Sequence, residues 1–207
     1  MIEPHRALII GKTKCGKTKW ILDLLESEYK YAFEVIIIIC PTVFKNQTYT
    51  SRKWVISDPE VYLCDPLLHK LTLNECIDIY SKAFEGVETL FIIDDCVFMQ
   101  DIRYRKDNCS LTKLVFSGRH DKHSVWLLTQ KYNEVLKGYR DNTDWIALFY
   151  TKDKTSFNQV LDENDFTDNE TRQKIKNHLR DKKYNKIIIN TEELPVSYKL
   201  LTSNKIF

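Results

Sequence analysis

The segment LIIGKTKCGKTKW, residues 8–20, decides which fold this chain is expected to adopt. Its apolar run ends at Gly11, and Gly11, Gly16, Lys17 and Thr18 fill every fixed position of the pattern G-x-x-x-x-G-K-[S/T]. In such a loop between a strand and a helix, backbone N–H groups point at a phosphate chain, helped by the positive end of the helix. A chance glycine turn is the alternative, but the apolar run before the loop and the helical pattern after it favour a phosphate-binding loop.

The two residues after Gly16 are expected to have separate roles. Lys17 would reach the β- and γ-phosphates of a nucleoside triphosphate, and the Thr18 hydroxyl would bind Mg²⁺. The set of residues predicted to bind the nucleotide is Gly11, Lys12, Thr13, Lys14, Cys15, Gly16, Lys17 and Thr18.

Short apolar runs alternate with amphipathic stretches of helix length along the chain. Continuous apolar runs are typical of strands buried on both faces, and strand–helix alternation favours a parallel sheet. We therefore expect an α/β fold with a mostly parallel central sheet flanked by helices. Strands are predicted at 6–10, 34–40, 61–64, 89–93, 124–129 and 145–150, and helices within 16–29, 71–84 and 108–118, the last with Ser110 as N-cap.

The chain is expected to form a core at 1–150 and a small C-terminal extension at 151–207, packed as one domain. Two β-like segments, 185–190 and 197–203, should end the extension as a hairpin. Charge is uneven, because residues 1–100 carry 11 Lys/Arg against 14 Asp/Glu, whereas the remainder carries 20 against 15. The densest basic run, 171–186, is either a solvated helix face or a surface for DNA or a neighbouring subunit.

Composition excludes several classes of protein. With 43% hydrophobic and 29% charged residues the chain is typical of a soluble globular protein, and no apolar stretch approaches the roughly 20 residues needed to span a bilayer. The N-terminus lacks the basic lead-in of a secretory signal, so the six cysteines are expected to be reduced thiols inside a cell. None of them has C-x-x-C spacing, which argues against a zinc site.

A second motif, TLFIIDDC at 89–96, places two carboxylates at the end of an apolar strand. Strand ends meet the phosphate loop at the carboxyl edge of a parallel sheet. Asp94 would therefore hold Mg²⁺, and Asp95 would orient or deprotonate a water that attacks the γ-phosphate. An ordinary Asp-Asp turn is the alternative interpretation. A paired acid favours hydrolysis over phosphoryl transfer to a small acceptor.

A third motif, FSGRHDKHSVWLLTQ at 116–130, contains two further candidates. Gln130 would lie beside the nucleotide and sense the γ-phosphate if its strand neighbours the strand that ends at Asp94; otherwise it is an ordinary loop residue. Arg119 precedes that strand, at the opposite edge of the sheet. A role in trans is therefore expected, as an arginine finger on a neighbouring subunit's γ-phosphate, with an exposed surface arginine as the alternative.

Arg140, in LKGYRDNTDW, is a second candidate finger or sensor, in a loop that could face the nucleotide edge. His120 and His123 follow Arg119 within four residues, but no third metal ligand accompanies them. Both histidines are therefore expected to be solvated loop residues.

The sequence resembles the viral genome-packaging ATPases of the FtsK–HerA superfamily, and most closely the branch found in poxviruses, other large DNA viruses, virophages and Polinton-like elements. The matching blocks cover about two thirds of the chain, and the Arg-His turn leading to a strand that ends in Gln is the most specific of them. They are GKTKCGKT at 11–18, FIIDD at 91–95, GRHDKHSVWLLTQ at 118–130 and, more loosely, YRDNTDWIALF at 139–149.

This resemblance implies a RecA-like core assembled into a homo-oligomeric ring. Such a ring would use ATP and Mg²⁺ to move double-stranded DNA, whatever its sequence, into a preformed capsid. Capsid vertex proteins would be candidate partners, and the place of action would be an assembly site in an infected cell or the virion. Many members of the superfamily carry Glu at the position of Asp95. The resemblance assigns nucleotide, metal and catalytic roles to Lys17, Thr18, Asp94, Asp95, Gln130 and Arg119.

Two other functions fit a phosphate-binding loop in a chain of this length. A nucleoside or nucleotide kinase should carry an arginine-rich lid, and DIRYRKDN at 101–108 comes nearest to one. A nucleotide switch without turnover is the third hypothesis, against which the acid pair Asp94–Asp95 argues.

Overall fold

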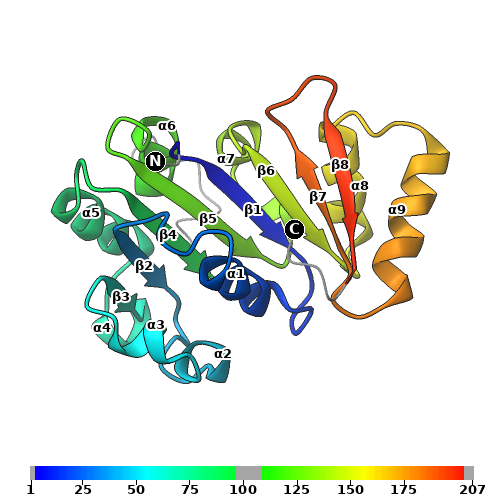
Figure 1. Cartoon of the computed structure of the whole chain (residues 1–207). Coiled ribbons are helices and arrows are strands. Elements are labelled where there is room, and N and C mark those ends of the chain that lie inside the picture. Colours follow the sequence, from blue (N-terminus) through cyan, green and yellow to red (C-terminus); the bar gives the residue numbers. More distant parts are fainter. Residues whose placement is uncertain (1–2, 97–108, 203–207) are drawn as a thin grey trace.

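The computed structural model describes residues 3–96 and 109–202. Its centre is a sheet of eight strands in the order β3-β2-β4-β5-β1-β6-β7-β8 (Figure 1). β1 to β6 are parallel, and β7 and β8 add to one edge in antiparallel pairing. The strands are β1 Arg6–Ile10, β2 Val35–Ile39, β3 Val61–Cys64, β4 Thr89–Asp94, β5 His123–Thr129, β6 Trp145–Phe149, β7 Lys186–Asn190 and β8 Ser197–Leu201.

Helices cover both faces of this sheet, and Figure 1 shows α1 in front of it and α8 behind it. One buried apolar cluster joins one face to α1, α2 and α3, and a second joins the other face to α5 through α9. The helices are α1 Lys17–Glu26, α2 Gln47–Thr50, α3 Lys53–Ser57, α4 Pro66–His69, α5 Leu73–Ala83, α6 Ser110–Ser117, the 3₁₀ helix η2 Tyr132–Glu134, α7 Lys137–Asp141, α8 Lys154–Glu163 and α9 Asn169–Asp181.

The predicted α/β class is confirmed, because β1, β2, β4, β5 and β6 are buried apolar strands inside the sheet, and β3 forms the edge next to β2. Successive side chains of β1 point to opposite faces of the sheet, so Leu8 and Ile10 belong to one cluster and Ala7 and Ile9 to the other. Several strands begin or end one or two residues from the predicted bounds, and at the start of α6 Cys109 rather than Ser110 is the N-cap. The reason is tertiary, since the Ser110 N–H donates to Asn74 Oδ1 on α5 at 2.9 Å.

The C-terminal extension continues the sheet of the core. β7 pairs with β6 from Trp145↔Asn190 to Phe149↔Lys186, and β8 pairs with β7 as the expected hairpin. The predicted basic run lies mainly on α9 and in the turn that follows it. This turn passes beside the loop between β1 and α1 at the lower edge of Figure 1, so the extension reaches the phosphate loop.

All six cysteines are buried, and none of them is in a disulfide. Across residues 3–96 and 109–202, no helix has both the length and the apolar character needed to cross a membrane.

Lys186, the first residue of β7, is buried with only 2% of its surface exposed. Its Nζ lies 5.5 Å from the centroid of the Trp20 ring and 5.7 Å from that of Phe149. Burial lowers the pKa of this ammonium to about 8, although the charge of Asp23 opposes the shift. The folded chain therefore resists the charged form of Lys186.

Lys186→Met is expected to raise the melting temperature at pH 7 by about 3–8 °C, because the variant removes a penalised buried charge. Between pH 8 and the unfolded-state pKa near 10.5, the unfolded chain binds one more proton than the folded chain. The wild type therefore gains stability as pH rises through this window, and the difference between the two proteins should shrink. Thermal melts followed by circular dichroism at several pH values measure this. Lys199→Met, on the exposed side of β8, is the control, and a difference constant with pH would contradict the prediction.

Candidate nucleotide-binding site

The loop between β1 and α1 is folded tightly enough to require glycine at two positions. Gly16 precedes α1 with φ of 98°, a left-handed conformation that residues with a side chain rarely adopt. A Cβ on Gly11 would lie 2.7 Å from both Cys15 Sγ and Phe149 Cβ. The close approach of neighbouring atoms therefore requires glycine at position 11, and the backbone conformation requires glycine at position 16.

Lys17 and Thr18, the first residues of α1, make different contacts. Lys17 Nζ donates to the Gly11 carbonyl oxygen at 2.7 Å, so its ammonium lies over the loop. The Thr18 hydroxyl donates to Asp94 Oδ2 at 2.8 Å. This hydrogen bond joins the phosphate loop to the end of β4, as expected from the convergence of parallel strands at one edge.

Asp94 is a buried carboxylate held by two hydroxyl groups. Besides Thr18, the Tyr49 hydroxyl donates to the same oxygen, Oδ2, at 2.8 Å. Burial raises the pKa of the Asp94 carboxyl, and the hydrogen bonds from Tyr49 and Thr18 and the charge of Lys17 oppose that rise. The ionised carboxylate therefore depends on its immediate partners, and a cation at this position would favour it further.

The donor set fits Mg²⁺ better than a softer metal. Thr18 and Asp94 offer a hydroxyl and a carboxylate oxygen, the hard ligands that Mg²⁺ prefers. In the part of the chain that the structure describes, no group of three or more His, Cys, Asp or Glu side chains could form an all-protein metal site. Mg²⁺ commonly completes its shell with water and substrate phosphates, so the two protein oxygens suffice.

Asp95 and Gln130 lie at the ends of adjacent strands. β5 runs between β1 and β4, and Asp94 pairs in register with Leu128. Gln130 Nε2 donates to Asp95 Oδ1 at 3.2 Å. Asp95 has a left-handed φ of 57°, which is uncommon for a residue with a side chain and typical of functional turns. The structure thus brings both predicted residues together, while their chemical roles stay predictions.

A cavity of about 470 Å³ opens over the loop and collects most of the predicted residues. Gly11 and Lys12 do not line it; Lys12 Nζ instead lies 5.0 Å from the centroid of the Tyr150 ring and lines a neighbouring cavity. Sequence reasoning missed the rest of the wall, which comes from the segment after β2, from α1 and from the turn after α9. These residues are Lys19, Thr42, Asn46, Thr48, Lys183 and Tyr184.

One sequence signal could have found part of this wall. The polar stretch after β2 follows the carboxyl end of a strand in the same parallel sheet, and that end faces the loop edge. Tyr49, whose hydroxyl reaches Asp94, is in this stretch. The turn after α9 carries no such signal, because an antiparallel strand follows it.

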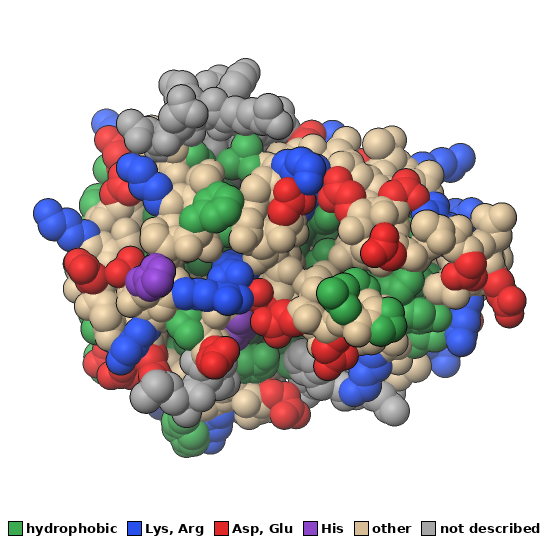
Figure 2. Space-filling model, turned by 90° about the horizontal axis from the view of Figure 1, so that it is seen from above, with side chains coloured by type: hydrophobic (Ala, Val, Ile, Leu, Met, Phe, Trp, Pro, Cys, Tyr) green, Lys and Arg blue, Asp and Glu red, His purple; other side chains and the backbone are tan. Residues whose placement is uncertain are grey.

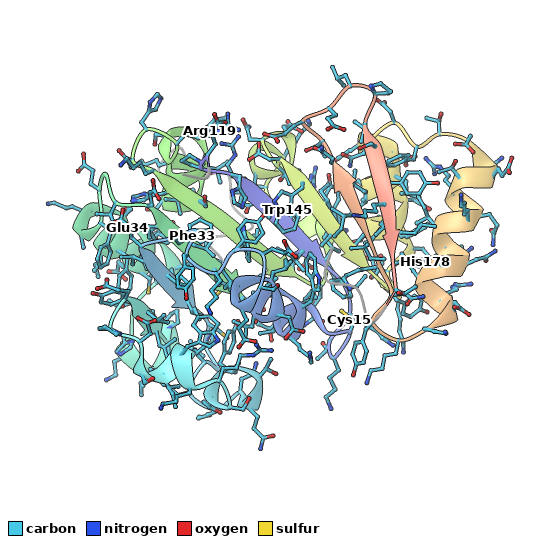
Figure 3. The ribbon with its side chains drawn as sticks, in the orientation of Figure 1. Cys15, Phe33, Glu34, Arg119, Trp145 and His178 are labelled. Atoms are coloured by element: carbon cyan, nitrogen blue, oxygen red, sulfur yellow. The ribbon has the colours of Figure 1, made fainter. Side chains whose placement is uncertain are left out.

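Arg119 lies at the opposite end of the sheet from Cys15 of the phosphate loop (Figure 3). Arg119 Nη2 is 2.9 Å from Asp144 Oδ1 and 3.9 Å from Glu192 Oε1, and half of the side chain is exposed. Figure 2 looks onto this end and shows basic and acidic side chains interspersed across it. Arg119 is therefore an oriented surface residue remote from its own phosphate loop, as the sequence predicted.

Arg140 is part of a structural cluster instead. Its Nη2 is 3.1 Å from Glu163 Oε1 on α8, and its guanidinium lies 5.0 Å from the centroid of the Tyr132 ring. Arg140 does not line the cavity over the loop. The interpretation of Arg140 as a finger or sensor thus loses its support, because Glu163 already pairs with the charge.

The expectation for His123 is wrong. His123 begins β5, is buried, and has Nε2 3.0 Å from the Phe84 carbonyl oxygen, whereas His120 is exposed. The short turn before β5 brings the strand start under the end of α5, which the sequence did not indicate. The lid-like segment 101–108 lies outside the described residues.

A glycine loop between a central strand and its helix, with acids at the end of a nearby parallel strand, defines a P-loop NTPase. The chain belongs to the Poxvirus A32 protein family, whose model matches residues 1–194. This match confirms the resemblance to viral packaging proteins inferred from the motifs. No curated protein matches the chain in sequence.

Solved structures share the fold over nearly the whole chain. The genome packaging NTPase B204 from Sulfolobus turreted icosahedral virus 2, in complex with AMPPCP, is 19% identical; the match covers 96% of this chain and 98% of that chain, with a TM-score of 0.66. B204 from the same virus in complex with sulfate is 20% identical; the match covers 98% of this chain and 98% of that chain, with a TM-score of 0.68. The N-terminal domain of zonular occludens toxin from Neisseria meningitidis is 10% identical, with 99% and 96% coverage and a TM-score of 0.54.

Tyr49→Phe is expected to raise the Mg²⁺ concentration needed for nucleotide binding about 10-fold, because Asp94 Oδ2 loses one of its two donors. Titration of Mg²⁺ against a fluorescent ATP analogue measures the change. Tyr139→Phe is the matched control, since that hydroxyl is also buried but donates to the carbonyl oxygens of Ala7 and Val125. Equal shifts in both variants would show that Tyr49 contributes only to packing.

Proposed function

We propose that this chain is an ATP-hydrolysing motor that moves double-stranded DNA into a preformed capsid. The observation that carries the proposal is the convergence of Thr18, Asp94, Asp95 and Gln130 in one cavity, through the Thr18–Asp94 and Gln130–Asp95 hydrogen bonds. Membership of the Poxvirus A32 protein family and the fold shared with packaging NTPases support the same class of function. Its place of action would be a site of virus assembly in an infected cell or the virion.

The residues of the cavity would divide the reaction among them. Amides of the loop and Lys17 bind the β- and γ-phosphates, and Thr18 and Asp94 hold Mg²⁺. When bound, Mg²⁺ draws negative charge from the transferring phosphoryl group. A water oxygen then attacks the γ-phosphorus, and the bond to the β–γ bridging oxygen breaks, so that its electron pair leaves with ADP.

Asp95 would accept the proton of the attacking water and pass it to the released phosphate. Gln130 holds Asp95 Oδ1 at 3.2 Å, so a contact between this amide and the γ-phosphate would also move the acid. This coupling supports hydrolysis rather than transfer to an acceptor. A nucleoside kinase needs an acceptor pocket and a lid, and no contact among the described residues favours it.

The position of Arg119 supports a homo-oligomer. Asp144 orients its guanidinium at the end of the sheet away from its own loop, where only another subunit could bring a γ-phosphate. Stacking the phosphate-loop end of one subunit against this end of the next would complete the site and, when repeated, close a ring. Capsid vertex proteins would then bind the ring from outside.

The C-terminal extension supplies the basic surface for DNA. A cavity of about 220 Å³ between β6, α8 and α9 is lined by Lys152, Lys154, Lys176 and Arg180. Such a cluster would contact backbone phosphates, which provide affinity without sequence preference. Only the surface that faces the pore has to be basic, so the net charge of +2 is compatible with this role.

Purified protein is expected to release phosphate from Mg²⁺–ATP, and linear double-stranded DNA at low salt should stimulate turnover several-fold. Raising salt from about 50 to 200 mM should abolish the stimulation, because phosphate contacts weaken steeply with salt. Lys17→Ala should lower turnover by roughly 100-fold or more, whereas Lys82→Ala, an exposed lysine in the last turn of α5 that does not line the cavity, should not. Turnover that ignores DNA but accelerates with an added nucleoside would identify a kinase instead.

Arg119→Ala is expected to lower turnover about 10³-fold while leaving ATP affinity within a factor of about three. Mixing this variant with Lys17→Ala should restore activity, because Arg119→Ala supplies an intact phosphate loop and Lys17→Ala supplies an intact arginine. Arg172→Ala, which breaks an ion pair between α9 and Asp162 of α8, is the control. Failure of the mixture to recover activity would exclude a role in trans.

A further inference from the structure

The turn after α9 forms part of the wall of the phosphate cavity. A Cβ on Gly16 would lie 2.6 Å from Tyr184 Cδ1, so the tyrosine ring packs directly on the phosphate loop. Lys183 and Tyr184 both line the cavity that contains Lys17. No motif explains this contact, since the turn belongs to the C-terminal extension.

A second cavity of about 450 Å³ continues from the first. The two cavities share Cys15, Lys183 and Tyr184, so the turn after α9 stands between them. Tyr150, which follows β6, and Lys12 line the second cavity together with residues of α9 and the turn. The space thus combines two aromatic rings with several cationic side chains.

The order of the strands shows on which side of the phosphate loop each cavity lies. Asp95 and Gln130 follow β4 and β5, on one side of the loop after β1. Tyr150 and Tyr184 lie at β6 and β7, on the other side. A nucleotide with its γ-phosphate beside Asp95 would therefore extend its nucleoside toward Tyr184.

The chemistry of the second cavity suits a nucleobase. Every base has a π face that stacks on aromatic rings, and its ring nitrogens and carbonyl oxygens accept hydrogen bonds from cationic side chains. Tyr184 is 42% exposed, which is unusual for a ring that only fills a core, and Lys183 Nζ lies 4.7 Å from its centroid. The ring is thus accessible and lies in an electropositive surrounding.

We propose that Tyr184, with Lys183 and Tyr150, forms the site for the nucleobase of the bound nucleoside triphosphate. This inference rests on the proposed function, in which the loop binds a nucleotide. Tyr184 would stack on the base while the loop residues hold the phosphates. The C-terminal extension would thereby distinguish a nucleotide from a bare polyphosphate.

The test compares the affinities of ATP and inorganic tripolyphosphate, each with Mg²⁺, by isothermal titration calorimetry. Tyr184→Ala is expected to weaken ATP binding about 10-fold and to leave tripolyphosphate affinity unchanged. Tyr184→Phe should keep the wild-type affinity for ATP, since stacking needs the ring and not the hydroxyl. Unchanged tripolyphosphate affinity also shows that the variant is folded around its loop.

Tyr31→Ala is the matched control. Tyr31 is 91% exposed, has a left-handed φ as Tyr184 does, and also lies under a preceding lysine, but it precedes β2 at the other end of the sheet. It should change neither affinity. Equal losses of both ligands in Tyr184→Ala, or no loss of ATP affinity, would overturn the inference. A wild type that binds neither ligand would overturn the proposed function as well.

Discussion

The hydrogen bond between the Thr18 hydroxyl and Asp94 Oδ2 is the contact on which the rest of the site depends. It joins α1, the helix that follows the phosphate loop, to the end of β4, which lies two strands from β1 in the sheet. Tyr49 reaches the same oxygen from the segment after β2, so three parts of the chain meet at one carboxylate. A charge buried at this depth is costly unless it is paired or hydrogen-bonded, which explains why the two hydroxyls accompany it.

The insertion of β5 between β1 and β4 has a direct chemical consequence. It puts Gln130 between the phosphate loop and the acid pair, within hydrogen-bonding distance of Asp95. In the proposed reaction, a change at the γ-phosphate would therefore move a strand end rather than an isolated loop. Because β5 begins near Arg119, one strand connects the two ends of the molecule that the proposed ring would bring into contact.

The C-terminal extension links the separate parts of the proposed mechanism. Its hairpin lengthens the sheet, its basic side chains gather between α8 and α9, and its turn after α9 packs on Gly16. Glu192, in the connection between β7 and β8, also lies 3.9 Å from Arg119. The extension thus contacts the region of the nucleotide site at one end of the sheet and the candidate finger at the other.

The sequence by itself determined the features that depend on local pattern. The glycine spacing predicted the loop, apolar runs predicted the strands, and the rule that parallel strands end at one edge brought Asp94, Asp95 and Gln130 together. Only the tertiary structure decided which side chains complete the site. Tyr49 is 45 residues from Asp94, and Tyr184 meets Gly16 only because an antiparallel strand returns along β6. Arg140 was misread for the same reason, since its partner Glu163 is on another helix. Local periodicity carries no information about such contacts, because packing between distant elements creates them.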